Sequence, residues 1–382
     1  MKRVWILAMA VLVLCAVPLR AAAVELEVAG KSAVLMDAAT GTVLYESNAH
    51  ERLAPASVTK IMTMLLIMEA VDSGKIAMTD MVTASEAAAA KGGSQVYLKV
   101  GESLSVSDML KCIAVSSAND CACAMAEHLA GSESAFVSMM NARAKELGMN
   151  DTNFVNCTGL DDGENAAEHK TSAHDIALMS RELLKNHPDI QKFTTIWMDT
   201  IRGGTFGLSN TNKLVRFYQG ATGLKTGFTS GAGYCLSATA RREGMELIAV
   251  VMGAETSASR NAACKQLLDY GFANYAVIAP ELPESEPIAV KLGKADSVAA
   301  VLGETDGILI DKAQKSTVTM DLSVEESVTA PVSQGQRLGT LTVKAGEQIL
   351  KEVPLVAAEG VERLSFGDLF GMVFRRAAMA KV

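Results

Sequence analysis

The sequence predicts an α+β fold, with one antiparallel sheet packed by helices, then a small all-β C-terminal domain and a C-terminal amphipathic helix. Three observations lead to this prediction. Strand-like runs lie at both ends of the region from residue 32 to 270, and helical signals fill its middle. Short runs rich in Val, Ile, Leu and Thr follow a Pro-rich stretch near residue 277. A chain of 382 residues is also long enough for two domains.

The first 23 residues have the layout of a secretory signal peptide. Lys2 and Arg3 give a positive start, residues 4–17 are apolar, and small residues end at Ala23. The apolar run is shorter than the roughly 20 residues of a spanning helix, which favours cleavage over an uncleaved anchor. We therefore expect residues 1–23 to be removed and the protein to be exported.

Residues 24–276 form the first predicted domain. The alternation of Ser32 to Asp37 and the turn before Thr42 to Tyr45 predict a β-hairpin. Capping residues and glycines then delimit the helices. We expect helices over 58–73, from 107, over 120–129, 133–147 and 172–185, and finally over 259–270, with strands over 223–226, 234–241 and 246–252. Ser172 and Asp175 are expected to form an acidic variant of the capping box.

Residues 277–357 form the second predicted domain, and residues 358–382 the tail. In the second domain, short β-type runs are separated by Gly, Asp or Pro, which is typical of an all-β domain. In the tail, apolar residues recur at helical spacing: Phe366, Leu369, Phe370, Val373, Phe374 and Ala377. The tail is too short and too charged to span a bilayer, so we expect it to lie on a membrane surface rather than dock on the protein itself.

Charge and cysteine usage exclude several classes of protein. The net charge of −8 argues against a nucleic-acid partner. Six cysteines follow the predicted cleavage site, and none has a metal-ligand spacing with histidine. We expect buried thiols, although export leaves their pairing open. No metal, nucleotide or flavin motif appears, so no metal and no cofactor are expected.

The first of three short motifs is Ser57-Val58-Thr59-Lys60, an S-x-x-K at the predicted start of a helix. One helical turn places Ser57 and Lys60 on the same face. The positive N-terminal dipole favours a serine alkoxide and opposes a charged lysine. Because a lysine acts as a base only when it is neutral, this position suits a nucleophile–base pair. On its own the motif is common, and an N-capping serine with a surface lysine would also explain it.

Two further motifs follow. Ser117-Ala118-Asn119 lies between two predicted helices, where a hydroxyl can relay a proton and an amide can hold a carbonyl, although capping alone would also explain it. Lys225-Thr226-Gly227 lies on a predicted strand, where Gly227 lets a substrate backbone approach. A second lysine near the first would lower its pKa further. In this order the three motifs are typical of penicillin-binding proteins and class A β-lactamases.

With these motifs the chain resembles the low-molecular-mass penicillin-binding D-alanyl-D-alanine carboxypeptidases of the S11 type, especially wall- and sporulation-associated forms of Gram-positive bacteria. The resemblance covers about residues 32–275, and the β-domain and tail more loosely. It implies a serine β-lactamase/transpeptidase-like domain that removes the terminal D-alanine from peptidoglycan stem pentapeptides. It also implies acylation by β-lactams and a location at the outer face of the cytoplasmic membrane or in the cell wall space.

The resemblance assigns a role to each motif residue. Ser57 would be the nucleophile, Lys60 the general base, Ser117 a proton shuttle and Asn119 a positioning residue. Lys225 would supply charge, and Thr226 with Arg260 would bind the terminal carboxylate. The backbone N–H groups of Ser57 and Phe228 would form the oxyanion hole. Phe228 replaces a histidine of some relatives, and Thr211 stands where the family has an arginine, which puts the rate of deacylation in question.

Several rival functions share parts of this pattern. A class A β-lactamase uses an extra glutamate, and the surroundings of Glu164 and Glu168 do not match that element. A transpeptidase differs only in whether an amine or water accepts the acyl group, and the sequence gives little information about this acceptor. A non-catalytic wall-binding protein is disfavoured because all three motifs are intact. A Ser-His-Asp hydrolase is disfavoured because the five histidines show no nucleophile-elbow partner, and solvated or capping positions explain them better.

Overall fold

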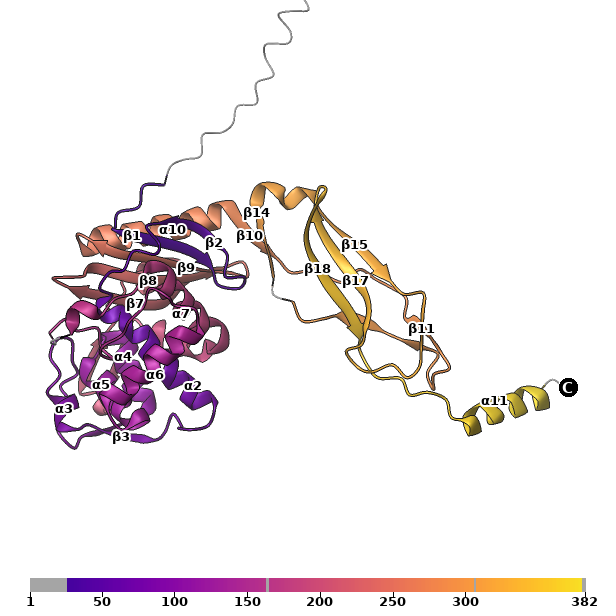
Figure 1. Ribbon diagram of the computed structural model, residues 1–382, viewed down its shortest axis with the longest axis horizontal. Helices are drawn as coiled ribbons and strands as arrows, with labels where there is room; N and C mark the ends of the chain where they lie inside the picture. The colour runs from indigo at the N-terminus through magenta and orange to yellow at the C-terminus, as the bar shows by residue number, and fades with distance from the viewer. Residues whose placement is uncertain (1–25, 163–164, 306, 380–382) are drawn as a thin grey trace, which may run out of the picture.

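The computed structural model describes residues 26–162, 165–305 and 307–379, so the predicted signal peptide lies outside the described residues. The described chain forms a larger α+β unit, a slender β-rich unit beside it and a short helix at the far end (Figure 1). No helix within the described ranges is both long enough and apolar enough to cross a membrane.

A five-stranded antiparallel sheet forms the centre of the larger unit. Its order is β2-β1-β9-β8-β7. The strands are β1 (Ser32–Asp37), β2 (Val43–Ser47), β7 (Ala221–Thr229), β8 (Gly233–Arg242) and β9 (Met245–Ala254). The first strand pairs with the last, from Ser32 opposite Met252 to Asp37 opposite Leu247. This pairing confirms the prediction that strands from both ends of the region build one sheet.

Both faces of this sheet are covered by helices, because successive strand residues point to opposite sides. Val34 and Met36 belong to the core shared with the helical layer, whereas Ala33 and Leu35 belong to the core under α10 (Ser257–Asn274). The helical layer contains α2 (Lys60–Asp72), α4 (Val106–Ser116), α5 (Asn119–Ala130), α6 (Glu133–Glu146) and α7 (Ala173–Asn186). Strand β7 is left at one edge, facing the start of α2.

The caps of these helices agree with the sequence in part. Ser132 and Ser172 cap α6 and α7, as predicted. Helix α4 begins earlier than expected, because Ser105 rather than Ser107 accepts the capping hydrogen bond. The predicted capping box at α7 is only half formed, because the Asp175 carboxylate accepts hydrogen bonds from the Asp151 N–H and the Thr152 hydroxyl.

Several short elements were not predicted. Two are hairpins: β3 (Met81–Thr83) with β4 (Ser103–Ser105), and β5 (Met198–Ile201) with β6 (Phe206–Ser209). The others are short helices: η1 (Ala56–Thr59), α3 (Glu86–Ala89), η2 (Ala166–Glu168), η3 (Pro188–Ile190), α8 (Gln191–Thr194), η4 (Arg202–Gly204) and α9 (Leu214–Phe217).

The second unit is all-β, as predicted, apart from the short helix η5 (Lys312–Thr317). Strand β10 (Tyr275–Ile278) leaves α10 and pairs with β14 (Ile308–Asp311). A three-stranded sheet has the order β12-β11-β16 and a four-stranded one the order β13-β18-β17-β15. Their strands are β11 (Ile288–Lys291), β12 (Ser297–Val298), β13 (Ala300–Leu302), β15 (Val318–Val324), β16 (Ser327–Thr329), β17 (Arg337–Ala345) and β18 (Gln348–Ala357).

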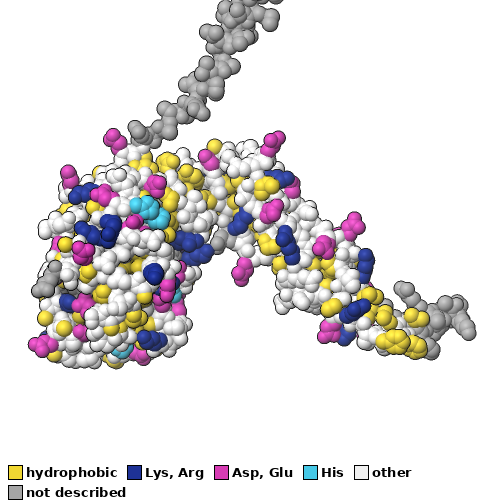
Figure 2. Space-filling model, viewed as in Figure 1, with side chains coloured by type: hydrophobic (Ala, Val, Ile, Leu, Met, Phe, Trp, Pro, Cys, Tyr) yellow, Lys and Arg dark blue, Asp and Glu magenta, His cyan; other side chains and the backbone are white. Residues whose placement is uncertain are grey.

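A helix, α11 (Phe366–Met379), ends the described chain. Phe366, Phe370 and Val373 are exposed. Figure 2 shows hydrophobic side chains gathered at this end of the molecule. Membrane association of the tail stays a prediction, as do the domain limits given above.

Candidate active site

Ser57 lies on η1, the tight turn that leads directly into α2. The residue before it, Ala56, has φ +48°, a left-handed conformation that is costly for a residue with a side chain. The Lys60 Nζ is 2.9 Å from the Ser57 Oγ and also donates to the Thr158 carbonyl at 2.7 Å. The S-x-x-K spacing therefore places the lysine amine on the serine hydroxyl, as predicted.

The Lys60 side chain is completely buried, and this burial changes its acidity. Loss of solvent lowers the pKa of Lys60 from 10.5 to about 7, although nearby Cys157 and Asp120 act in the opposite direction. A substantial fraction of the amine is then neutral near pH 7. A neutral amine within hydrogen-bond reach of a serine hydroxyl has the geometry and the acidity of a general base.

The S-x-N motif lies where α4 ends and α5 begins, as predicted. Ser117 closes α4 in a left-handed conformation and is buried. The Asn119 side chain donates to the Gly92 carbonyl at 2.7 Å, and its backbone N–H donates to the Ser94 carbonyl at 2.7 Å. Its buried Oδ1 has no hydrogen-bond partner among the described residues. An unpaired buried acceptor is costly, which suits an atom that bonds to a ligand.

The K-T-G motif lies on the edge strand β7 and packs directly against the turn that carries Ser57. A β-carbon at Gly227 would lie 2.7 Å from the Pro55 carbonyl oxygen and 3.1 Å from the Ser57 backbone nitrogen. The glycine is therefore needed for the strand to approach the turn that carries Ser57, in addition to any approach of a substrate backbone. The buried Lys225 donates to the Thr226 carbonyl at 2.9 Å. Burial, followed by the charges of Lys60 and Arg260, lowers the pKa of Lys225.

Arg260 lies on the first turn of α10 and is also buried. Its guanidinium donates to the Ser257 hydroxyl and the Asn261 side-chain oxygen, at 3.0–3.1 Å. It also lies over the Tyr234 ring at 5.8 Å. Since all these groups are neutral, the guanidinium charge is left available to an anion.

The remaining predicted residues lie beside this cluster. Phe228 is 54% exposed, and its ring centroid is 4.3 Å from that of Tyr234. The Thr226 hydroxyl is 2.6 Å from that of Thr211. The structure therefore brings all nine predicted site residues to one region, between the start of α2, the α4–α5 junction and the β7 edge.

Sequence reasoning missed His169, which was assigned to a solvated or capping position. It is buried, and burial followed by the charge of Lys60 lowers its pKa to about 4. The Val155 N–H donates to Nδ1, so Nε2 carries the proton and donates to the Thr59 hydroxyl at 2.7 Å. Thr59 in turn donates to the Ala56 carbonyl at 2.8 Å. This chain of hydrogen bonds holds the strained turn before Ser57.

The cysteines take the structural role that was expected. All six described cysteines are buried and unpaired. Burial raises the pKa of Cys264 to about 12 and that of Cys235 to about 11, which keeps both as thiols. Buried, protonated thiols behave as small apolar side chains.

A group that could hold a metal ion lies outside the cluster. Glu69, Glu182 and His187 bring one ligand atom each within 4.8 Å of one another. Arg143 already pairs with the two carboxylates, at 2.7 and 2.6 Å. This ion pairing accounts for the grouping without a metal.

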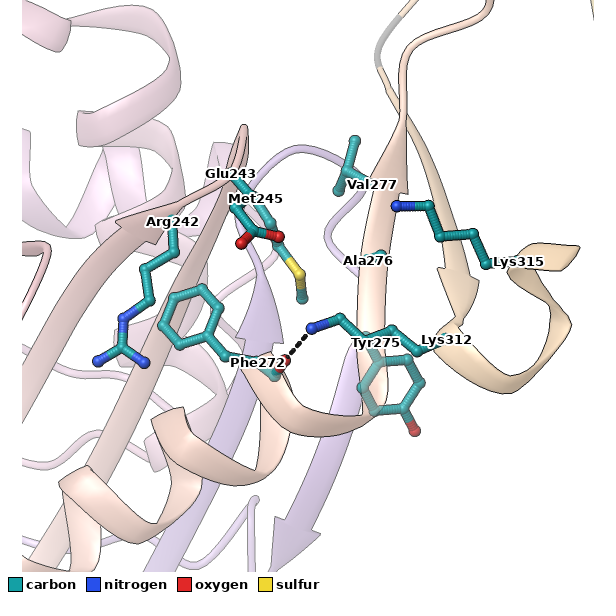
Figure 3. A pocket seen from close by; sticks show the side chains of 9 residues that line it. All are labelled: Arg242, Glu243, Met245, Phe272, Tyr275, Ala276, Val277, Lys312 and Lys315. Carbon is teal, nitrogen blue, oxygen red and sulfur yellow. Dashed lines mark hydrogen bonds between the residues drawn. The ribbon is translucent and has the colours of Figure 1, made fainter.

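Two hollows flank the Ser57 cluster, and a third lies elsewhere. One of about 470 Å³ includes Phe228 and Gly231, and one of about 240 Å³ includes Thr158 and Leu160. A cavity of about 290 Å³ lies at the junction between the two units, where Lys312 donates to the Phe272 carbonyl at 2.6 Å (Figure 3). None of the nine predicted site residues lines the junction cavity, and of the two flanking hollows only the one of about 470 Å³ is lined by one of them, Phe228.

A serine and a buried lysine at a helix start, faced by a lysine-bearing edge strand, define the class of serine penicillin-binding enzymes. Comparison with known proteins agrees with this class. The chain belongs to the Peptidase S11 family, described as D-alanyl-D-alanine carboxypeptidase, whose profile matches residues 19–256. Residues 283–363 match the C-terminal domain of penicillin-binding protein 5. The predicted family is thus confirmed.

Individual relatives support the same assignment. The chain is 46% identical to D-alanyl-D-alanine carboxypeptidase DacF of Bacillus subtilis (strain 168), over 90% of this chain and 88% of the relative. Penicillin-binding protein 5 from Haemophilus influenzae is similar in structure, with TM-score 0.71 and 32% identity over 88% of this chain and 98% of that one. Penicillin-binding protein D2 from Listeria monocytogenes, in its ampicillin-bound form, has TM-score 0.59 and 32% identity over 65% and 99% of the two chains.

Proposed function

We propose that this serine D-alanyl-D-alanine carboxypeptidase removes the terminal D-alanine from peptidoglycan stem pentapeptides through an acyl-enzyme on Ser57. The observation that supports this most is the buried Lys60 amine, 2.9 Å from the Ser57 hydroxyl, with a pKa of about 7. Neutral Lys60 takes the hydroxyl proton while Ser57 attacks the carbonyl of the penultimate D-alanine. Terminal D-alanine leaves, and water then hydrolyses the acyl-enzyme.

The oxyanion formed in each step needs hydrogen-bond donors. We assign the backbone N–H groups of Ser57 and Phe228, because Gly227 lets β7 approach the Ser57 nitrogen closely. A donor of this kind contributes about 3 kcal/mol to transition-state stability. The Phe228 ring, exposed at the cleft, shapes the fit of the substrate without entering the chemistry.

The terminal carboxylate of the substrate is assigned to Lys225, Thr226 and Arg260. Burial opposes a charge on both Lys225 and Arg260, and the charge of Arg260 also opposes one on Lys225. A bound carboxylate offsets these costs. The Thr226 hydroxyl, already ordered by Thr211, gives a neutral donor at the same place. A substrate lacking this carboxylate should therefore bind poorly.

Ser117 and Asn119 are assigned to proton transfer and substrate positioning. Ser117 is buried at the end of α4, beside Asn119, and its hydroxyl would relay a proton to the leaving amine. The Asn119 amide is fixed by the Gly92 carbonyl, and its unpaired Oδ1 faces a ligand donor once substrate is bound. The buried position of both side chains supports these roles.

Two rival reactions share the acyl-enzyme. A transpeptidase passes the acyl group to an amine, and a β-lactamase hydrolyses β-lactams rapidly. Of the two glutamates weighed for the class A role, Glu168 is exposed on η2, which does not favour that role. Glu164 lies outside the described residues. The S11 family assignment favours the carboxypeptidase.

The deciding experiment incubates mature protein and Ser57→Ala with a fluorescent penicillin, and assays D-alanine released from a stem pentapeptide. We expect labelling and release from the wild type only. Rapid β-lactam turnover without D-alanine release would mean a β-lactamase. Transfer to an added amine in place of release would mean a transpeptidase, and absence of labelling would mean a binding protein.

We also propose that the protein is exported and that α11 binds the outer face of the cytoplasmic membrane. The exposed aromatic side chains of Phe366 and Phe370 support surface binding, since a helix with an apolar face lies in the plane of a bilayer interface. Deletion of residues 361–382 should move the protein from the membrane pellet to the supernatant. Sedimentation equal to that of the full chain would contradict the proposal.

A further inference from the structure

The segment from Thr158 to Asp161 crosses the mouth of the active site, and each residue makes a different contact there. The Thr158 carbonyl accepts the hydrogen bond from Lys60 at 2.7 Å. Gly159 lies directly against the turn before Ser57. A β-carbon added at Gly159 would be only 1.8 Å from the Ala56 carbonyl oxygen. These two contacts fix the first half of the segment against the catalytic turn.

The second half of the segment reaches the opposite wall. Leu160 lies close to Gly93, because a β-carbon added at Gly93 would be 3.2 Å from the Leu160 Cδ2. The residue before it, Gly92, accepts the hydrogen bond from the Asn119 side chain. Asp161 lies close to Gly231, in the turn that follows β7, because a β-carbon added at Gly231 would be 3.5 Å from the Asp161 Oδ2. The Asp161 carboxylate thus lies across the cleft, beside the chain that continues from Phe228.

The proposed assignments give the substrate a direction along β7. Its terminal carboxylate lies at Lys225, Thr226 and Arg260, and its scissile carbonyl lies where Gly227 meets the Ser57 nitrogen. The acyl part of the peptide therefore continues the other way, past Phe228 toward Gly231. The cleft is positive at the carboxylate end and carries the Asp161 carboxylate at the acyl end.

The distance fits one particular position of the substrate. Residues 230 and 231 belong to the turn after β7, so the three residues from Phe228 to Gly231 span at most about 10 Å, their length at about 3.3 Å per extended residue. On the substrate, one residue step of about 3.8 Å and a four-carbon side chain of about 6 Å cover the same length. An amine at the end of a side chain on the residue before the D-Ala-D-Ala pair would therefore reach Asp161.

We infer that Asp161 binds a side-chain ammonium on the residue preceding the D-Ala-D-Ala pair, and so selects stem peptides with a free diamino acid at that position. The carboxylate is exposed and makes no ion pair or hydrogen bond with any described residue, so it is available to a substrate cation. This inference rests on the proposed function, because that function fixes the direction of the peptide. Asp161 is a specificity-determining residue and takes no part in bond breaking.

The test uses two peptides ending in D-Ala-D-Ala that differ only in a free or an acetylated side-chain amine. The measured quantity is the ratio of kcat/KM for the free-amine peptide to that for the acetylated peptide. In Asp161→Asn we expect this ratio to fall about fivefold, the factor that corresponds to an ion pair worth about 1 kcal/mol. High salt should lower the wild-type ratio in the same direction.

Asp296→Asn is the matched control, since it removes an equal charge from an exposed aspartate of the second unit. Its ratio should remain that of the wild type. An unchanged ratio in Asp161→Asn, or an equal fall in Asp296→Asn, overturns the inference. Release of D-alanine from the acetylated peptide by the wild type separates this outcome from failure of the proposed function, which would abolish release from both peptides.

Discussion

The pH dependence of acylation tests whether Lys60 is the base that activates Ser57. With a pKa of about 7, most Lys60 amines are neutral at pH 8, whereas only about 1% are neutral at pH 5. Because only the neutral amine accepts the serine proton, acylation should slow about 100-fold between these two values. An ordinary lysine, with a pKa of 10.5, would give a rate that still rises steeply above pH 9.

The assay is the second-order rate constant for labelling by a fluorescent penicillin from pH 5 to 9 at constant ionic strength, with circular dichroism to show that the protein stays folded. Lys60→Arg is the control, because a guanidinium stays charged throughout this range and should leave labelling negligible. A rate that is flat from pH 5 to 8, or one whose inflection lies near 10, would refute the assignment of Lys60 as the base.

Three further predictions concern the architecture around this pair. Gly227→Ala would put a β-carbon within 3.1 Å of backbone atoms on the turn before α2, so labelling should slow about 100-fold, whereas Gly207→Ala, with nothing within 4 Å, should label normally. His169→Ala removes the two hydrogen bonds of the buried imidazole and should lower the free energy of unfolding in urea by about 3 kcal/mol. An unchanged value would mean that the turn before Ser57 is stable without His169. The folded pKa of Lys60, about 7, lies below its unfolded value, so the unfolded chain binds the extra proton between pH 7 and 10.5. The free energy of unfolding of the wild type relative to Lys60→Met, measured in urea at pH 7.5 and 8.5, should therefore rise by about 1.4 kcal/mol per pH unit, and a fall would contradict the lowered pKa.

The sequence predicted the parts of the site that depend on local spacing. Ser57 and Lys60 meet because a three-residue separation is one helical turn, and Ser117 and Asn119 lie at a junction because helical signals end and restart around them. The central sheet was also predictable, since strand-like runs lie on either side of the helical region, and the strands they form, β1 and β9, are buried on both faces. The hairpins β3–β4 and β5–β6 were missed because strands of three or four residues show too little alternation.

Other parts of the site depend on contacts between distant segments, which spacing does not reveal. The Lys60 amine is bound by Thr158, 98 residues away, and the turn before Ser57 is supported by His169, 110 residues from Thr59. Neither residue belongs to the three catalytic motifs. Gly227 was predicted as a site residue, but the reason that this position needs a glycine is the contact between β7 and the Ser57 turn, which the sequence does not reveal.

The three buried basic side chains, together with the proposed carboxylate site, explain why the enzyme acts at the end of a peptide. Lys60, Lys225 and Arg260 are each costly to bury with a charge, and Lys225 is also opposed by the charges of the other two. A substrate carboxylate bound at Lys225 and Arg260 favours a protonated Lys225. A positive Lys225 then disfavours a second charge on Lys60 and keeps that amine neutral. On this reasoning the terminal carboxylate both binds the substrate and determines that the proton resides on Lys225 and not on Lys60. A peptide without a free C-terminus would therefore lose the ionic contact and also leave Lys60 less often neutral and able to act as the base.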